Sequence, residues 1–300
     1  MKKSVILGPA RNRALFDNPI TLKPHLAEQL KLGRLAIVLG AGASFGFGLP
    51  SWDVLIDRCL NISGMTRLPG RSAEDLGEDI LTEACKGDDI IFARLVRQAL
   101  YANVDLSIRA LRSNELLAAI AALTMVSRRG SVGRVISFNF DDMLERYLRQ
   151  SGFKMRSVNK LPCWSSNHDV TVYHPHGLLE SEGPVDVVNE PIVFALIHYN
   201  RLRSDKPLWY SLLLDIFSSS TCLFIGLSGS DWNLAEALTA ANAVHVGRHQ
   251  HAFWGIRFSD DTNDPNLGKW ETRGVIQTTL SNYDELPTFL FDVCQSAAQL

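Results

Sequence analysis

Residues 35–51 read LAIVLGAGASFGFGLPS, and this stretch decides the fold class. The five consecutive apolar residues 35–39 predict a buried strand. The strand leads directly into a loop rich in glycine. Ser51 follows where a helix N-cap is favoured, and helical spacing of apolar residues resumes in WDVLIDRCL. The stretch therefore predicts a strand, a glycine-rich loop and a helix, and apolar spacing in 22–32 adds a helix before it.

Further units of the same kind follow along the chain. Strands are predicted at 134–138, 170–174, 221–227, 252–257 and 275–279, and helices at 141–150, 197–203, 208–218 and 285–298. Strands that alternate with helices favour an α/β fold, with a Rossmann-like parallel sheet and helices on both faces. We interpret 1–300 as a single domain. Within it, 62–129 shows helical stretches such as 80–100 and 114–129 but no strand pattern, which predicts a helical insertion.

The composition is that of an ordinary globular protein. Hydrophobic residues make up 46% of the 300 residues and charged residues 21%. An apolar run of about 18 residues, as a membrane span needs, is absent from the sequence, so we expect no membrane partner. The apolar run near the amino terminus ends at Gly8-Pro9, too early for a secretory signal, so we expect a cytoplasmic protein.

Charge and cysteine content exclude two further classes. The net charge is −2 and there is no long basic block, so we expect no direct contact with nucleic acid. Five cysteines are scattered without a Cys-x-x-Cys pair, which argues against a disulfide framework and against a zinc site of four thiolates. We expect buried free thiols.

The glycine-rich loop suits the phosphates of a dinucleotide. Gly40 and Gly42 allow the backbone to approach a pyrophosphate, whose charge is then met by backbone amides. The pattern lacks the full G-x-G-x-x-G spacing, and no Lys-Ser/Thr follows to make a nucleoside-triphosphate loop. A tight structural turn is therefore the alternative.

Four motifs, each after a predicted strand, resemble those of the sirtuin family and occur in the same order. They are GAGASFGFGLP at 40–50, ISFNFDDMLE at 136–145, HPHGLL at 174–179 and FIGLSGSD at 224–231. They resemble, in turn, the sirtuin signature loop, the Asn-x-Asp motif, the His-Gly motif and the late Gly-x-Ser loop. The resemblance implies a sirtuin-like core over about two-thirds of the chain.

The chain resembles the bacterial sirtuin-like NAD hydrolases of anti-phage defence more closely than the protein deacetylases. Ser51-Trp52 stands where deacetylases have Asp-Phe-Arg, and the zinc-binding cysteine quartet is absent. The resemblance implies hydrolysis of NAD to nicotinamide and ADP-ribose, as the NAD-depleting effector of an abortive-infection system. NAD would be the substrate, and no metal is expected.

Three residues are candidates for the chemistry. Asn139 can orient ribose hydroxyls or place the attacking water, and the alternative is that it caps the helix beginning near 141. His176 can act as general base, unless it is a hydrogen-bonded loop histidine. By resemblance, Asp141 would receive the nicotinamide carboxamide, although a carboxylate in the first turn of a helix is also favourable structurally. We expect neither Asn139 nor His176 to belong to the core.

The binding residues are assigned from the two glycine loops. Gly40, Ala41, Gly42 and Ser44 would hold the phosphates. By resemblance, Gly226 and Ser228 approach the adenosine or phosphate end of NAD, with an ordinary strand-to-helix turn as the alternative.

Several other polar and aromatic residues receive structural interpretations. Asp231 is expected to cap the helix after Trp232 rather than touch ligand. His174 and His176, like His249 and His251, have a spacing that metal sites use, but no further ligand cluster accompanies them. Aromatic residues at helical spacing are usually core, so Tyr199 and Trp209, with Asn200, are left out of the site.

Unregulated NAD hydrolysis would kill the host cell, so activity must be gated. We expect gating by a homo-oligomer or by a regulatory partner protein, which in related defence systems is of the ATPase or Argonaute type. Two other functions stay open. One is an NAD-dependent protein deacylase or ADP-ribosyltransferase, and the other is a non-catalytic module that senses NAD or ADP-ribose.

Overall fold

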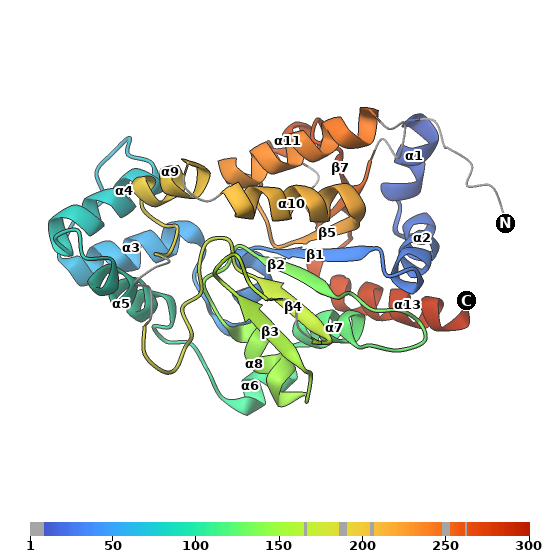
Figure 1. Ribbon diagram of the computed structural model, residues 1–300, viewed down its shortest axis with the longest axis horizontal. Helices are drawn as coiled ribbons and strands as arrows, with labels where there is room; N and C mark the ends of the chain where they lie inside the picture. The colour runs from blue at the N-terminus through green and yellow to red at the C-terminus, as the bar shows by residue number, and fades with distance from the viewer. Residues whose placement is uncertain (1–8, 165–166, 186–190, 205–206, 248–252, 262) are drawn as a thin grey trace. The chain divides into compact units, whose positions relative to one another are not determined.

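A computed structural model describes residues 9–164, 167–185, 191–204, 207–247, 253–261 and 263–300, and its strands form one sheet (Figure 1). The strands are β1 (Leu35–Leu39), β2 (Arg134–Ser137), β3 (Met155–Val158), β4 (Val170–Tyr173), β5 (Thr221–Ile225), β6 (Gly255–Ser259) and β7 (Val275–Thr279). Their order is β3-β4-β2-β1-β5-β6-β7. The pairs β3–β4, β5–β6 and β6–β7 are parallel, with Met155 opposite Val170 and Cys222 opposite Gly255. The predicted α/β fold with a parallel sheet is confirmed.

Helices occupy most of the chain between the strands. They are α1 (Pro9–Phe16), α2 (Pro19–Lys31), η1 (Ala41–Phe47), α3 (Trp52–Ser63), α4 (Ala73–Asp79), η2 (Ile80–Ala84), α5 (Asp89–Leu100), α6 (Ile108–Ser113), α7 (Glu115–Thr124), α8 (Met143–Gln150), α9 (Leu196–Ser204), α10 (Pro207–Ser219), α11 (Trp232–Gly247), α12 (Leu267–Glu271), η3 (Tyr283–Glu285) and α13 (Leu286–Gln299). Here η1 and η3 are 3-10 helices and η2 is a π-helical turn.

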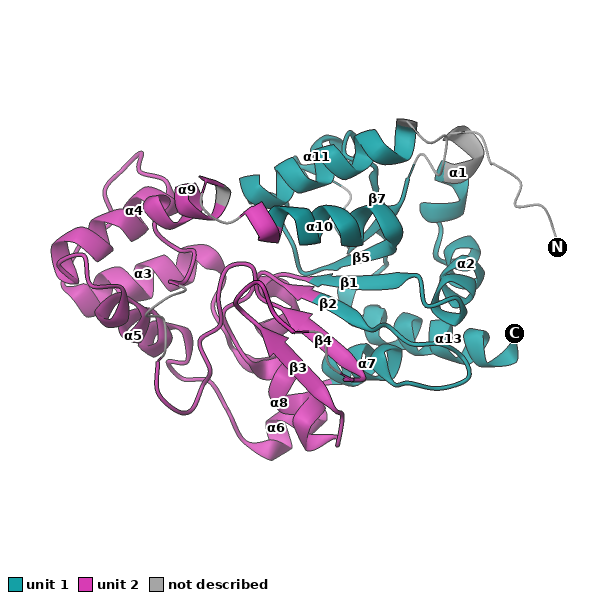
Figure 2. Ribbon diagram, in the orientation of Figure 1, with its two compact units in different colours: residues 1–38, 115–135, 210–300 teal, residues 39–114, 136–209 magenta. Residues whose placement is uncertain are grey.

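The chain divides into two compact units. One comprises 1–38, 115–135 and 210–300, and the other comprises 39–114 and 136–209 (Figure 2). Each unit is assembled from segments that are separated in the sequence, so the two units do not correspond to two consecutive parts of the chain. The interpretation of 1–300 as one domain stays a prediction.

The first unit has helices on both sides of its strands. Helices α10 and α11 lie on one side of β5, and α7 and α13 lie on the other (Figure 2). Helix α13 packs against both α2 and α7. All residues of β1 and β6 are buried, as expected of strands covered on two faces. The predicted helical layers are therefore present.

The second unit contains much of the helical segment expected at 62–129. Residues 62–129 are all described, and they contain helices and no strand. The stretch 80–100 was expected to be continuously helical, and this is wrong: the helix breaks after Ala84, where Lys86 and Gly87 both have positive φ. Helix α5 then begins anew, because the Asp88 side chain accepts hydrogen bonds from the first-turn amides of Ile90 and Ile91.

The predicted strands are recovered with small shifts, and one strand was missed. Strand β5 ends two residues earlier than expected, because Gly226 turns with a φ of 72°. Strand β6 begins at Gly255, and the start expected at 252 lies outside the described residues. Strand β3 was not predicted. It is one of the two edge strands of the sheet, and three of its four residues are only half-buried, so its sequence lacks a clear apolar pattern.

Two general expectations can be compared with the structure. Among the helices in the described part of the chain, none is long and apolar enough to cross a membrane. Four cysteines are free and buried as expected, and the fifth, Cys163, is half-buried.

Candidate functional site

The carboxyl ends of β1 and β2 bring the glycine loop next to Asn139. The Phe138 amide donates to the Leu39 carbonyl at 3.0 Å, which aligns the two chain segments where their strands end. After Gly40 the loop folds into the 3-10 helix η1, whose first bond joins the Ala43 amide to the Gly40 carbonyl at 2.9 Å. Gly48, with a φ of 77°, ends this helix. The glycine loop is therefore an ordered helical turn.

The Asn139 side chain is anchored to that turn. Its Nδ2 donates to the Gly40 carbonyl at 3.0 Å and lies 3.4 Å from Ser44 Oγ. The backbone amide of Asn139 donates to Ser137 Oγ at 3.3 Å. Helix α8 begins only at Met143, so the Asn139 side chain does not cap that helix. It forms hydrogen bonds with the glycine loop instead. Two motifs of the predicted site, at 40–50 and 136–145, meet at this residue.

Asp141 lies beside Asn139 and is buried. Its Oδ1 accepts hydrogen bonds from Ser44 Oγ at 3.2 Å and from the Met143 amide at 3.1 Å. The pKa of Asp141 is raised to about 6, chiefly by burial; the hydrogen bonds from Met143 and Ser44 oppose the shift, and the nearby carboxylates of Glu145 and Asp142 add to it. The first-turn position expected of Asp141 is wrong, because α8 begins at Met143 and Asp141 precedes it; its carboxylate instead accepts from the Met143 amide, and the carboxamide contact stays a prediction.

His176 belongs to the core of the second unit, which corrects the expectation that it lies outside. Its exposed fraction is 3%, and its ring packs edge-on against Phe138 at 4.9 Å and Tyr199 at 5.4 Å between centroids. Its backbone carbonyl accepts from the Val193 amide at 2.8 Å. Because Phe138 directly precedes Asn139, the imidazole packs against the segment that carries the amide. The contacts with these two aromatic rings position the imidazole, and they could not be predicted from the sequence.

The other histidine of the HPH motif forms a buried pair with Glu145. His174 Nε2 lies 2.6 Å from Glu145 Oε1, and His174 Nδ1 lies 3.3 Å from the Asn139 carbonyl. Burial lowers the pKa of His174, but the charge and hydrogen bond of Glu145 outweigh it, so the pKa is raised. Sequence reasoning missed this pair. The only signal was the cluster of three acids at 141–145, at the start of a helix.

A second buried carboxylate network involves Asp142. Its Oδ1 lies 2.9 Å from the Tyr101 hydroxyl and its Oδ2 accepts from Ser181 Oγ at 3.1 Å, while its amide donates to the Tyr101 oxygen at 3.1 Å. The Tyr101 hydroxyl also lies 2.8 Å from the Leu179 carbonyl. Burial raises the pKa of both Asp142 and Tyr101. Tyr101 comes from the helical segment and carries no sequence signal of this role.

The late glycine loop, in the first unit, follows β5. Ser228 is exposed, and its Oγ lies 2.9 Å from Ser230 Oγ. Gly229 has a φ of 77°, and a Cβ there would lie 2.5 Å from the Trp270 ring, so only glycine fits. The expected strand-to-helix turn is present. Contact of Gly226 and Ser228 with a nucleotide stays a prediction.

Residues 133–276 match the family model described as SIR2-like domain. The matched segment includes three of the four motifs, with Asn139, His176 and the late loop, and it starts after the glycine loop at 40–50. The resemblance to sirtuins is thus supported for this part of the chain. No curated protein matches the chain. A solved structure described as "Structural Basis for the Mechanism and Regulation of Sir2 Enzymes" is 14% identical, with a TM-score of 0.45, over 92% of this chain and 97% of that one.

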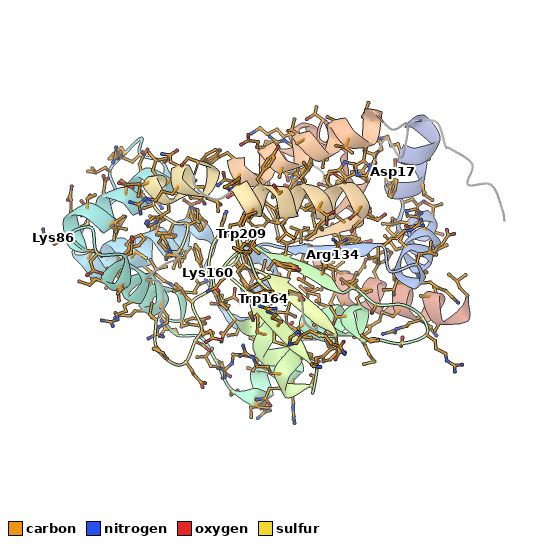
Figure 3. All side chains as sticks on the ribbon, in the orientation of Figure 1. Asp17, Lys86, Arg134, Lys160, Trp164 and Trp209 are labelled. Carbon is orange, nitrogen blue, oxygen red and sulfur yellow. The ribbon has the colours of Figure 1, made fainter. Side chains whose placement is uncertain are left out.

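Other residues of the SIR2-like segment have structural roles. Asp231 caps α11 as expected, since its Oδ1 accepts from the Leu234 amide at 2.7 Å. Trp209, which is labelled in Figure 3, and Tyr199 are buried, as predicted for core aromatics, and Asn200 is exposed.

Metal binding was considered for two histidine pairs. His249 and His251 lie outside the described residues. Elsewhere, the residues that the structure describes hold no group of three or more His, Cys, Asp or Glu side chains that could bind a metal ion.

Proposed function

We propose that this protein hydrolyses NAD to nicotinamide and ADP-ribose. The observation that carries the proposal is the contact of Asn139 with Gly40 and Ser44, which joins two sirtuin-like motifs at one place. The buried ring of His176 packs against the residue next to Asn139. The match of 133–276 to the SIR2-like domain supports an NAD-related function.

The reaction breaks the bond between the ribose C1′ and the nicotinamide nitrogen. The electron pair of that bond goes to the pyridine ring, which leaves as neutral nicotinamide, and a water oxygen bonds to C1′ and loses a proton. With Nδ2 held by Gly40, the Asn139 Oδ1 accepts a hydrogen bond from a ribose hydroxyl or from the water. His176 takes the proton as general base.

The remaining site residues bind the substrate in this proposal. The Asp141 carboxylate accepts a hydrogen bond from the nicotinamide carboxamide. Gly40, Ala41, Gly42 and Ser44 contact the phosphates. Gly226 and Ser228 contact the adenosine or phosphate end of NAD.

We further propose that the activity is gated, as the NAD-depleting effector of an anti-phage system requires. Gating would come from assembly into a homo-oligomer or from a partner of the ATPase or Argonaute type. Size-exclusion chromatography with light scattering tests this: we expect turnover only in an oligomeric or partner-bound fraction. An isolated monomer with full activity would contradict gating.

The experiment that tests the function incubates the purified protein with NAD, with and without candidate activators, and separates the products by chromatography. We expect nicotinamide and ADP-ribose in equal amounts without any added acceptor. Nicotinamide release that depends on an acyl-peptide, or ADP-ribose attached to protein, would indicate a deacylase or a transferase. Binding of NAD without release under every condition would indicate a sensing module.

A further inference from the structure

His174 connects three parts of the second unit at a fully buried position. It follows β4, its Nε2 contacts Glu145 of α8, and its Nδ1 contacts the carbonyl of Asn139 after β2. The side chains of His174 and Glu145 are 0% and 1% exposed. The backbone amide of His174 is itself held by the Val158 carbonyl at 2.8 Å. Both ring nitrogens and the backbone amide of His174 therefore have partners.

Both ring nitrogens of His174 face oxygen acceptors. A neutral imidazole has one donor and one acceptor nitrogen, so one of its nitrogens would point a lone pair at an oxygen. An imidazolium donates from both nitrogens and satisfies both contacts. The charged groups around the ring are the carboxylates of Glu145 and Asp141, and both favour the cation. The geometry of the two contacts and the raised pKa of His174 therefore both favour the imidazolium form.

A second buried histidine in the same unit shows the contrast. His198 Nε2 lies 3.0 Å from Asp89 Oδ1, but its Nδ1 accepts from the Ala195 amide at 3.4 Å. A neutral imidazole satisfies both contacts, and burial lowers the pKa of His198 in spite of Asp89. Both pairs join a histidine to a carboxylate, Glu145 in one and Asp89 in the other. They differ in the partner of Nδ1, which is a donor for His198 and an acceptor for His174.

We infer that Glu145 and His174 are positioning residues, a buried carboxylate–imidazolium pair that holds the Asn139 carbonyl and thereby directs the Asn139 side chain. Three hydrogen bonds define the orientation of Asn139: Nδ2 to Gly40, the amide to Ser137 and the carbonyl to His174. If the hydrogen bond from His174 to the Asn139 carbonyl is lost, the peptide plane after Asn139 can rotate. The Asn139 side chain then no longer keeps its orientation. The role in turnover rests on the proposed NAD hydrolysis, whereas the role in orientation does not.

The first test observes the wild-type protein by ¹⁵N NMR of the histidine rings, with His174 assigned from a His174→Gln variant. We expect both ring nitrogens of His174 to carry a proton at pH 7.5, and His198 to carry one. A His174 ring with one unprotonated nitrogen at this pH would overturn the inference. This measurement needs neither turnover nor a variant of Glu145.

The second test compares Glu145→Gln with the matched control Asp89→Asn. Glu145→Gln should shift the Asn139 side-chain amide signals, lower kcat for nicotinamide release by about 10-fold or more, and change KM by less than about twofold. Asp89→Asn should leave the Asn139 signals and kcat unchanged. A folded Glu145→Gln protein with unchanged Asn139 signals and unchanged kcat would refute the positioning role.

The two proposals fail in different ways. If the wild-type protein never releases nicotinamide, NAD hydrolysis is wrong, but the NMR signals of His174 and Asn139 still decide the positioning role. If Glu145→Gln does not fold, the protonation state of His174 in the wild-type protein decides it.

Discussion

The Asn139 side chain donates to the Gly40 carbonyl at 3.0 Å and so joins two loops that are 99 positions apart. Each loop follows a strand of the same sheet, and the carboxyl ends of such strands are where α/β proteins place their ligands. The contact links the sirtuin-like glycine loop to the segment that matches the SIR2-like domain. The proposed chemistry depends on this contact.

Asn139→Ala should abolish measurable nicotinamide release, a loss of about 100-fold or more, because the group that orients the ribose or water is gone. The variant loses one well-formed hydrogen bond at a half-buried position, so its free energy of unfolding should fall by only about 1 kcal/mol. Chromatography and urea unfolding measure the two effects. Retained turnover in a folded variant would exclude Asn139 from the chemistry.

His176→Ala should lose activity and also stability. The ring is 3% exposed between Phe138 and Tyr199, so its removal leaves a cavity that costs about 2–4 kcal/mol. His176→Gln keeps more of the volume and should fold better, but it cannot take a proton. We expect both variants to lack nicotinamide release, and turnover by the glutamine variant would rule out general-base catalysis by this residue.

Asp141→Asn should stabilise the protein in a pH-dependent way. The pKa of Asp141 rises from 3.8 to about 6 on folding, so the folded state binds its proton more tightly than the unfolded state. Its contribution to stability is therefore greatest below about pH 4, decreases as the pH rises to about 6, and is constant above that. The difference in unfolding free energy between variant and wild type should grow over this window by about 3 kcal/mol. Urea unfolding at pH 4, 5, 6 and 7 measures it, and a constant difference would contradict the shift.

Ser44→Ala should move the pH dependence of activity upward. The Ser44 hydroxyl donates to Asp141 and stabilises its charged form, so its loss raises the pKa of Asp141 further. If the Asp141 carboxylate receives the carboxamide, wild-type release should increase as the pH rises through about 6, and the variant should need a higher pH. Rate profiles from pH 5 to 8 measure both midpoints; a variant midpoint that stays in place or falls would contradict this role.

Ser228→Ala should weaken binding of ADP-ribose, measured by titration calorimetry, without lowering the melting temperature. Ser228 is exposed, so its truncation leaves the core intact. Ser230→Ala is the matched control, because the two hydroxyls contact each other at 2.9 Å in the same loop. Equal affinity for all three proteins would remove Ser228 from the binding residues.

Much of the fold could be predicted from the sequence because its central strands are covered on both faces. The apolar run at 35–39 coincides with β1, and the strand expected at 221–227 contains β5; both strands lie inside the sheet. Edge strand β3 was missed because MRSV at 155–158 is only half-buried. The break before α5 falls at Lys86 and Gly87, which both have positive φ; the polar stretch KGDD at 86–89 interrupts the apolar spacing there and could have signalled it.

The sequence motifs name candidate site residues one by one, but the contacts between these residues could not be predicted. The HPH motif does not tell which histidine packs against aromatic rings and which pairs with a carboxylate. That distinction depends on Glu145, which is 29 positions from His174, and on Phe138 and Tyr199, which meet His176 only in the folded chain. Tertiary contacts decide which partner each histidine has, and these contacts cannot be predicted from the local sequence.

The central claim is that the nicotinamide end of NAD binds where the residues at 139 and 176 lie. A crystal structure of the Asn139→Ala variant grown with NAD tests it most directly, because substrate survives in a variant that cannot turn it over. We predict that the nicotinamide ribose lies against residue 139, with a hydroxyl or an ordered water within hydrogen-bond distance of His176. Intact NAD bound with its nicotinamide ribose at any other place would contradict the account.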